Sequence, residues 1–338
     1  MEAMVLRAPR ELQRATVARP LPSADEVLVC VHNSGICGTD LKIYNGGIPV
    51  RYPRIMGHEM CGELVEGEGD GLRPGDRVMI DPVGYCNVCW CCRAGHTNVC
   101  PHGLLLGRDA DGGFAEYVKV PRRWIFPLPA AIGSREAPII QVATTCLHAQ
   151  RRVEIFPGQS VIVMGLGVSG QIEMQLAKAR GAKPVIGVTR SAWKRKLAEK
   201  LGADVTLSSG EEAEHAVEEI ANGHGADLVI ETTGKPVAMA SAVRMARRGG
   251  TVLLFGISTM TEASLPFYQF YFKELTLVNA RAAKSEDYPV TIDLVARGVL
   301  KLKELITHVM PLPELAAALA LLDSDSDQRM KVILTHSY

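Results

Sequence analysis

A glycine-rich turn between an apolar run and a helical pattern constrains the fold of this chain more than any other feature. Residues 160–181 read SVIVMGLGVSGQIEMQLAKARG, and the buried strand predicted at 161–164 leads into a G-x-G-x-x-G motif formed by Gly165, Gly167 and Gly170. The helix is predicted from apolar residues at helical spacing, Ile172, Leu176 and Ala179, and Gly181 stands where it should stop. Between a strand and a helix, such glycines let the backbone approach a pyrophosphate, which rests on the helix N-terminus beside Val168 and Ser169. A plain glycine turn is the alternative explanation.

Strand and helix patterns alternate after this turn. Further strands are predicted at 184–188, 204–207, 226–233 and 251–256, and helices at 192–201, 211–222 and 236–247. Gly202 and Gly249–Gly250 are expected to mark helix ends. This alternation predicts a parallel sheet covered by helices on both faces, so residues 150–280 are expected to form a dinucleotide-binding domain. The preceding region differs, because it has short β-like runs punctuated by glycine and proline, as in GLRPGDRVMIDPVGY.

Five of the nine cysteines lie in one segment, residues 84–100, which reads GYCNVCWCCRAGHTNVC. Four of them have the spacing C-x2-C-x2-C-x7-C: Cys86, Cys89, Cys92 and Cys100. Short C-x2-C steps point successive thiolates at one centre, which suits a structural zinc ion with four protein ligands. An iron–sulfur cluster also takes four cysteines, but its usual spacings differ. Cys91 is predicted to be a spare thiol that faces outward, and Cys30 and Cys61, in apolar strand-like runs, to be small buried hydrophobes.

The charge balance narrows the possible partners. The 37 basic and 37 acidic residues give zero net charge, so nothing indicates nucleic acid or an anionic membrane as a partner. Charges interrupt every apolar run in MEAMVLRAPRELQ, which does not resemble a signal peptide, and no apolar run approaches the ~20 residues needed to span a bilayer. We therefore expect a cytoplasmic protein, and in a reducing compartment clustered cysteines more often hold metal than form disulfides.

Two further stretches complete a resemblance to a known family. Residues 33–44 read NSGICGTDLKIY, and residues 54–62 read RIMGHEMCG. CGTD, GHE, the four-cysteine segment, GLGVSG and LITHVMPL (305–312) follow one another as in the zinc-dependent medium-chain dehydrogenase/reductase superfamily, which the chain resembles over nearly its whole length. The resemblance implies an α/β fold in which a GroES-like, partly β-barrel catalytic domain accompanies a Rossmann domain with a doubly wound parallel sheet. The implied ranges are 1–149 for the catalytic domain, with its structural zinc lobe at 84–101, 150–280 for the Rossmann domain, and 281–338 for the return to the catalytic domain. A homodimer or homotetramer is also implied.

The resemblance implies a second, catalytic zinc ion, and so two zinc ions per chain. Cys37 and His58 resemble the two constant ligands, and Glu59 resembles the acidic neighbour that binds the metal or replaces a departing ligand. Polyol dehydrogenases of the family have an acidic residue seven positions before the histidine of a run like LHAQRR, and this chain has Gln141 there, seven before His148. Direct binding by Gln141, as in some sugar dehydrogenases, a water-bridged contact and no contact all remain open.

Other roles are carried over by position. Thr39 matches the hydroxyl group that binds the substrate alcohol and begins a proton relay, and Asp40 matches the carboxylate that orients the ligating histidine. Lys42 stands where the family often has a relay histidine, which leaves the last relay step open. Candidate residues lining the substrate and nicotinamide cleft are Tyr44, Thr145 and Arg281. Zinc would polarise the alcohol oxygen while hydride passes to the nicotinamide.

The residue after the second Rossmann strand selects between NAD and NADP. NAD enzymes place Asp or Glu there to hold the ribose 2′-hydroxyl. This chain reads PVIGVTRSAWKRK, which places Thr189, Arg190 and Ser191 at that point and Arg195 one turn later. Loss of the carboxylate removes repulsion against a 2′-phosphate, and Arg190 can pair with it, so NADP is favoured over NAD. The alternative is that Arg190 stacks on adenine while NAD binds. Further cofactor contacts are expected at Thr233 and Gly256.

These features together predict a zinc-dependent oxidoreductase that transfers a hydride between a secondary alcohol, polyol or sugar-like, and NAD(P), giving the ketone. Amino-alcohol oxidation of the threonine dehydrogenase kind is one alternative. A zinc-free quinone or enoyl reductase on the same scaffold is another, but those proteins lack the four-cysteine lobe and the Cys/His pair. A binding protein without activity is a third, and Cys37, His58, Glu59 and Thr39 argue against it. The expected partner is a small-molecule alcohol, with no nucleic acid and no membrane.

Overall fold

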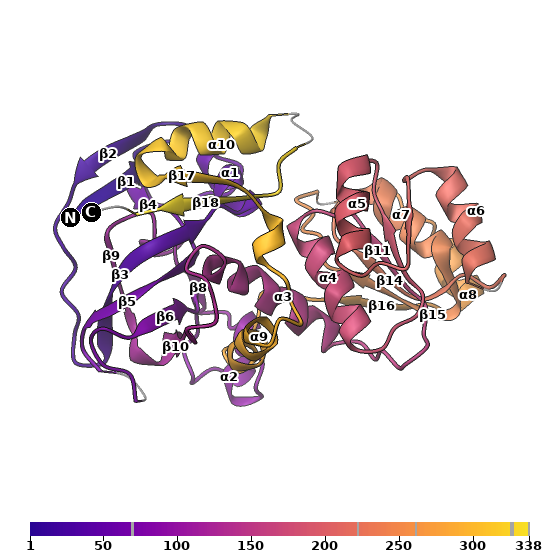
Figure 1. The fold of residues 1–338 in the computed structure, drawn as a ribbon, viewed down its shortest axis with the longest axis horizontal. Coiled ribbons are helices and arrows are strands. Elements are labelled where there is room, and N and C mark those ends of the chain that lie inside the picture. The colour runs from indigo at the N-terminus through magenta and orange to yellow at the C-terminus, as the bar shows by residue number, and fades with distance from the viewer. Residues whose placement is uncertain (69–70, 222, 261, 325–327, 337–338) are drawn as a thin grey trace. The chain divides into compact units, whose positions relative to one another are not determined.

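The structure, a computed structural model, describes residues 1–68, 71–221, 223–260, 262–324 and 328–336 (Figure 1). The chain forms two compact units, residues 1–144 with 284–338, and residues 145–283. The expected boundaries at 149/150 and 280/281 therefore differ from the observed ones by a few residues. The reason for the first difference is that helix α3 (Ile140–Gln150) runs through the boundary instead of ending at it.

The first unit is built around a seven-stranded sheet whose centre is β3 (Glu26–Gly35). The strands that pair with β3 in antiparallel fashion are β5 (Glu59–Glu66), β9 (Tyr117–Pro121) and β18 (Lys331–Thr335). Strands β6 (Arg77–Ile80) and β10 (Ile125–Pro127) extend the sheet beyond β5, and β17 (Ile306–Pro311) lies parallel to β18. In this register Gly35 is opposite Glu59 on one side and Ile333 on the other, so segments far apart in the sequence meet at Gly35.

Smaller elements complete the first unit. A three-stranded sheet consists of β1 (Glu2–Leu6), β2 (Leu12–Thr16) and β4 (Arg54–Ile55), and a two-stranded sheet of β7 (Val83–Gly84) and β8 (Leu104–Leu105). The helices are α1 (Gly38–Tyr44), α2 (Trp90–Arg93), α9 (Asp287–Ala296) and α10 (Leu315–Asp323). Residues of α1, α10, β1 and β18 share one buried apolar core, which anchors α1 to the sheet.

The second unit is a six-stranded parallel sheet. Its strands are β11 (Val161–Met164), β12 (Val185–Val188), β13 (Val205–Leu207), β14 (Ala226–Glu231), β15 (Ala246–Leu254) and β16 (Thr276–Asn279). They lie in the order β13-β12-β11-β14-β15-β16, in which the direction of succession reverses between β11 and β14. Ligands of such sheets bind outside the carboxyl ends of the strands at this reversal.

Helices connect these strands and pack around the sheet (Figure 1): α4 (Val168–Ala179), α5 (Ala192–Lys200), α6 (Glu211–Ile220), α7 (Pro236–Met245) and α8 (Phe267–Lys273). Several details differ from the predictions, which did not include α8 or β16. Ala179 was expected on the apolar face of α4 but is exposed. The buried part of α4 runs from Gly170 to Ala177, so Ala179 lies beyond it in the last turn. Gly249 and Gly250 lie inside β15, which begins at Ala246 with a shifted register against β14, so they do not mark a helix end. Within the described residues, no helix is both long and apolar enough to cross a membrane.

Candidate metal centres and dinucleotide site

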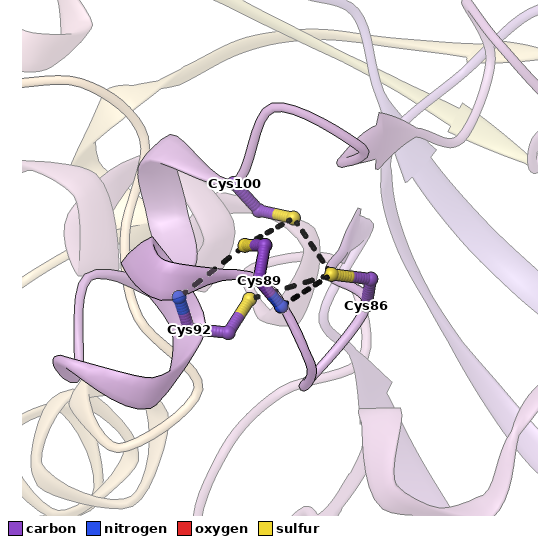
Figure 2. A group of neighbouring side chains, drawn as sticks. All are labelled: Cys86, Cys89, Cys92 and Cys100. Carbon is purple, nitrogen blue, oxygen red and sulfur yellow. Dashed lines mark hydrogen bonds between the residues drawn. The ribbon is translucent and has the colours of Figure 1, made fainter.

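The four predicted cysteine ligands converge on one point (Figure 2). Their sulfur atoms are separated by 4.0 Å for Cys86 and Cys92, 3.7 Å for Cys89 and Cys100, and 3.6 Å for Cys86 and Cys100. Four sulfur atoms at about 2.3 Å from a central zinc ion would lie about 3.8 Å from one another in a regular tetrahedron. The observed separations match that figure, so the four thiols fit a tetrahedral zinc ion.

Backbone geometry brings these thiols together. Cys89 is the N-cap of α2, and its Sγ accepts a hydrogen bond from the backbone N–H of Cys92 at 3.5 Å, while Cys89 N–H donates to Cys86 Sγ at 3.4 Å. Backbone N–H groups of Val88 and Cys89 lower the pKa of Cys86 to about 6. Burial and the neighbouring Cys89 raise the pKa of Cys92 to about 12. This contrast is expected when several thiols share one site, because one thiolate opposes ionisation of the next.

The remaining cysteines correct part of the sequence-based prediction. Cys91 does not face outward: it is only 6% exposed, whereas its neighbour Trp90 is 74% exposed. Consecutive helical residues point in different directions, and in the single turn of α2 it is the tryptophan that faces solvent. Cys61 is buried in β5 as predicted, and its thiol donates to the Ser134 carbonyl at 3.4 Å. Cys30 in β3 is only half-buried.

A second group of possible metal ligands consists of Cys37, His58 and Glu59, whose ligand atoms lie within 4.8 Å of one another. Cys37 follows β3 and caps the N-terminus of α1, and Glu59 begins β5. The pairing of Gly35 with Glu59 across β3 and β5 therefore brings the three side chains together. A thiolate, an imidazole and a carboxylate are all zinc ligands, and three protein ligands with an open fourth position are typical of catalytic zinc.

Asp40 links Cys37 to His58. This fully buried carboxylate accepts the Cys37 backbone N–H on Oδ2 at 2.9 Å, and its Oδ1 lies 3.3 Å from His58 Nδ1. With Nδ1 facing Asp40, the Nε2 atom of His58 is left for a cation. Burial lowers the pKa of His58, but the charge of Asp40 and the contact with Cys37 outweigh it, so the pKa lies well above its usual value. Asp40 is therefore placed to orient the His58 ring.

Glu59 has a partner that sequence reasoning missed. Its Oε2 pairs with the ammonium group of Lys331 on β18, and the two side chains are 0% and 3% exposed. Among the described residues, neither Glu59 oxygen has a hydrogen-bond partner although both are buried. The available signal was a lysine at the start of an apolar strand-like run, KVILT, where a buried charge needs a counter-charge.

The other predicted catalytic residues of the first unit lie on α1 and α3. The backbone N–H of Thr39 donates to Cys37 Sγ at 3.5 Å, which fixes the half-buried Thr39 next to that thiol. Gln141 is buried on α3, and Lys42 is half-buried in the last turn of α1. The Tyr44 hydroxyl group donates to the Arg10 carbonyl at 3.4 Å, and its side chain packs against the core shared by α1 and α10.

In the second unit, the glycines after β11 form a cradle. A Cβ atom on Gly170 would lie 1.8 Å from the Gly165 carbonyl oxygen, so only glycine allows this close approach of α4 to the turn. Gly165 also has a positive φ of 86°, which other residues rarely adopt. A Cβ on Gly167 would meet nothing within 4 Å, so the backbone at the start of α4 is open. This is the arrangement that a pyrophosphate at a helix N-terminus requires.

The ends of β14 and β15 extend this cradle. Glu231, fully buried at the end of β14, accepts the backbone N–H of Thr233 at 2.7 Å and that of Gly234 at 3.0 Å. A Cβ on Gly256 would lie 2.0 Å from the Gly234 nitrogen, so the two turns touch through glycine backbone. Glu231 was not among the predicted site residues, and it holds the turn that carries the predicted Thr233.

The turn after β12 carries the residues expected to meet the adenosine ribose. The Arg195 guanidinium folds back from α5 and donates to the carbonyl oxygens of Thr189 at 2.8 Å and Arg190 at 3.0 Å. Ser191 is buried as the N-cap of α5, whereas the Arg190 side chain is exposed. Arg195 therefore supports the turn, whereas the side chain of Arg190 is available to a ligand.

Comparison with known proteins is consistent with both units. A family model described as "Alcohol dehydrogenase GroES-like domain" matches residues 23–130, and one described as "Zinc-binding dehydrogenase" matches residues 169–297. L-galactonate-5-dehydrogenase of Escherichia coli K12 is 34% identical over 320 residues, which cover 94% of this chain and 93% of the relative. The chain belongs to the zinc-dependent medium-chain dehydrogenase/reductase superfamily. As a member of it, the protein is an NAD(P)-dependent alcohol oxidoreductase with a GroES-like and a Rossmann part.

Two solved structures of this superfamily contain a cofactor. A putative zinc-binding dehydrogenase from Sinorhizobium meliloti 1021, bound to NADP, has a TM-score of 0.92 and 32% identity, and the match covers 99% of this chain and 98% of that one. An Escherichia coli CFT073 protein named short chain alcohol dehydrogenase, complexed with NADH, has the same TM-score and identity and 99% coverage of both chains. Both kinds of nicotinamide cofactor therefore occur among relatives of this dehydrogenase.

The structure distributes the predicted site residues of this dehydrogenase between its two units. Cys37, Thr39, Asp40, His58, Glu59 and Gln141 belong to the first unit, and the glycine cradle and the Thr189–Ser191 turn belong to the second. Thr145 is half-buried on the part of α3 that belongs to the second unit, and Arg281 is exposed after β16 in the same unit.

Proposed function

We propose that this dehydrogenase oxidises a secondary alcohol group of a polyol or a sugar acid to the ketone, with NADP as the preferred acceptor and two zinc ions per chain. The observation that carries the proposal is the group of half-buried Cys37 and buried His58 and Glu59, with Asp40 behind the histidine. A zinc-free reductase has no need for this arrangement, because the thiolate, imidazole and carboxylate together make a cation site.

In this proposal Cys37, His58 and Glu59 hold the catalytic zinc ion. Zinc supplies Lewis acidity, which lowers the pKa of an alcohol group. Asp40 keeps the His58 ring in one orientation and one tautomer, and the Thr39 hydroxyl binds the alcohol and takes the first step of proton transfer outward. Gln141, neutral and buried, completes the ligand set directly or through water. Lys42, in the last turn of α1, is the candidate for the next step toward solvent.

The second zinc ion belongs to Cys86, Cys89, Cys92 and Cys100. All four positions are taken by thiols at the separations of a tetrahedron, which leaves no coordination position for substrate. Its role is therefore structural: it braces a lobe whose α-helix, α2, has a single turn.

The cofactor preference rests on charge. Thr189 stands where a carboxylate would select NAD, and the exposed Arg190 follows it. A hydrogen bond to a charged group contributes about 1.5–3 kcal/mol, which corresponds to about tenfold or more in relative kcat/KM. Arg190→Ala should therefore raise KM for NADP much more than for NAD, and Thr189→Asp with Arg190→Ala should reverse the preference. If the wild type is faster with NAD, or Arg190→Ala affects both cofactors equally, the arginine does not read the 2′-phosphate.

The substrate class is proposed from relatives and tested directly. A relative named L-galactonate-5-dehydrogenase covers almost the whole chain, and its name describes oxidation of a hydroxyl group on a polyhydroxy acid. The experiment is a panel of polyols, aldonic acids, L-threonine and simple secondary alcohols, assayed by NAD(P)H absorbance with both cofactors at one salt concentration. Activity confined to L-threonine would favour the amino-alcohol alternative.

Metal dependence separates this proposal from its alternatives. Cys37→Ala and His58→Ala should abolish turnover but keep nicotinamide binding, because the glycine cradle belongs to the other unit. Gln141→Ala should do less harm. Full activity of metal-free enzyme would refute the mechanism. A homodimer or homotetramer and a cytoplasmic location are part of the proposal, and sedimentation and cell fractionation test them.

A further inference from the structure

The buried pair of Glu59 and Lys331 adds a positive charge to the proposed catalytic metal site. Lys331 lies on β18, and its ammonium group contacts Glu59 Oε2 and donates to the Ile36 carbonyl at 3.1 Å. Ile36 is the residue immediately before Cys37. One lysine therefore contacts one proposed ligand directly and the backbone beside another.

The surroundings hold this contact in place. The Ile36 backbone N–H donates to the Val332 carbonyl at 3.1 Å, so the strand that carries Lys331 is bonded to the segment that carries Cys37. A Cβ on Gly35 would lie 2.2 Å from Glu59 Oε2 and 2.9 Å from Lys331 Cε. The absence of a side chain at Gly35 is therefore what makes room for the pair.

The two oxygens of Glu59 have different surroundings. Both oxygens are buried without a hydrogen bond among the described residues, and only Oε2 is in an ion pair, with Lys331. A buried carboxylate without its counter-charge is strongly unfavourable. Removal of Lys331 would therefore strengthen the attraction between Glu59 and any other cation nearby. The nearest cation would be the metal ion held with Cys37 and His58.

We propose that Lys331 is a positioning residue that restrains Glu59 from full coordination of the catalytic zinc ion. By engaging one carboxylate oxygen, Lys331 leaves at most one for the metal and keeps a coordination position available for the substrate. The inference rests on the proposed zinc site and deepens it. Without Lys331, Glu59 binds the metal more fully, so the ion is held more tightly and is less able to accept substrate.

The test measures the release of zinc from the purified zinc-loaded enzyme to the chromogenic chelator 4-(2-pyridylazo)resorcinol. Two release phases are expected, and Cys37→Ala, which removes the catalytic ligand, identifies the phase that comes from the four-cysteine site. Changes next to metal ligands commonly alter metal affinity about 10–100-fold. Lys331→Met should therefore slow the catalytic phase about tenfold or more and lower kcat, whereas Lys331→Arg, which keeps the charge, should restore release toward the wild-type rate.

A double-variant comparison shows whether Lys331 acts through Glu59. Glu59→Gln should accelerate release, and Lys331→Met should have no further effect in the Glu59→Gln background. A matched control is Lys119→Met, which breaks an exposed pair with Glu26 at 2.9 Å in the same unit and should leave both phases unchanged. If Lys331→Met does not fold, Lys331→Gln takes its place, since its amide still donates a hydrogen bond without carrying charge.

Three outcomes overturn the inference: unchanged release in folded Lys331→Met, faster release in that variant, or an effect of the same size when Glu59 is Gln. Failure of the proposed function has a different signature. In that case wild-type enzyme and Cys37→Ala would contain the same amount of zinc and show the same single release phase.

Discussion

Glu173 provides a quantitative test of how α3 and α4 pack in the second unit. This carboxyl group on α4 is fully buried, and Gln150 Nε2 on α3 donates both to its Oε2 at 2.8 Å and to its backbone carbonyl at 2.7 Å. Burial outweighs this hydrogen bond and raises the pKa of Glu173 from 4.5 to about 8. Glu173 is therefore protonated in the folded protein at neutral pH, whereas the unfolded chain has lost that proton.

The sign of the pH effect follows. Between pH 4.5 and 8 the folded state binds one proton more than the unfolded state, so stability falls as pH rises. The slope is about 1.4 kcal/mol per pH unit, or about 3 kcal/mol between pH 5 and 7.5. For a protein of this size, about 1 kcal/mol corresponds to about 2–4 °C in Tm, so this group alone lowers Tm by about 6–12 °C over that range.

The assay compares thermal unfolding of wild type and Glu173→Gln from pH 5 to 8. The glutamine is neutral at every pH, so its Tm should exceed that of the wild type at pH 7.5, and the difference should shrink toward pH 5. Glu154→Gln, an exposed carboxylate in the same unit, is the control and should follow the wild type. Parallel curves for wild type and Glu173→Gln would refute the reasoning, because they would mean that Glu173 does not hold its proton on folding.

Three further predictions use other parts of the molecule. Cys89→Ser should lose one zinc ion per chain while cofactor binding persists, and Cys91→Ser should keep both ions; the opposite pattern in metal analysis would refute the ligand assignment. Gly170→Ala should abolish nicotinamide binding measured by calorimetry, because its Cβ would lie 1.8 Å from the Gly165 carbonyl oxygen. Burial lowers the pKa of His336 from 6.5 to about 3. Below pH 6.5 this imidazole is therefore protonated in the unfolded chain but stays neutral in the folded protein. Stability should fall by about 1.4 kcal/mol per unit as pH decreases from 6.5, and His336→Gln should flatten this slope in pH-dependent melting, whereas exposed His102→Gln should not.

The sequence predicted the features that depend on local pattern. Five of the six strands of the second unit were recognisable as short apolar runs between turn residues, and β11 begins and ends at the predicted residues. The sixth, β16, was not predicted. The four thiols of the lobe were recognisable because tight loops make their spacing a direct geometric constraint. The direction of Cys91 was missed, since spacing alone does not say which face of a single helical turn is buried.

Features that depend on distant segments could not be predicted. The contact between Lys331 and the Ile36 carbonyl joins residues 295 positions apart, and only the pairing of β18 with β3 creates it. The packing of the Tyr44 side chain against the core of the first unit also depends on segments that are distant in the sequence. The early start of β15 depends on a shifted register with β14, which no single strand reveals.

The position of β18 has a consequence for how the enzyme is made. A ribosome produces Cys37, His58 and Glu59 early, and the whole nucleotide-binding unit follows before Lys331 leaves the exit tunnel. Until then β3 lacks its β18 neighbour, and Glu59 lacks the ammonium group with which it is buried. A nascent chain can therefore fold its lobe and its nucleotide-binding unit first, but the surroundings of the proposed catalytic ligands are complete only once β18 is also available to pair with β3.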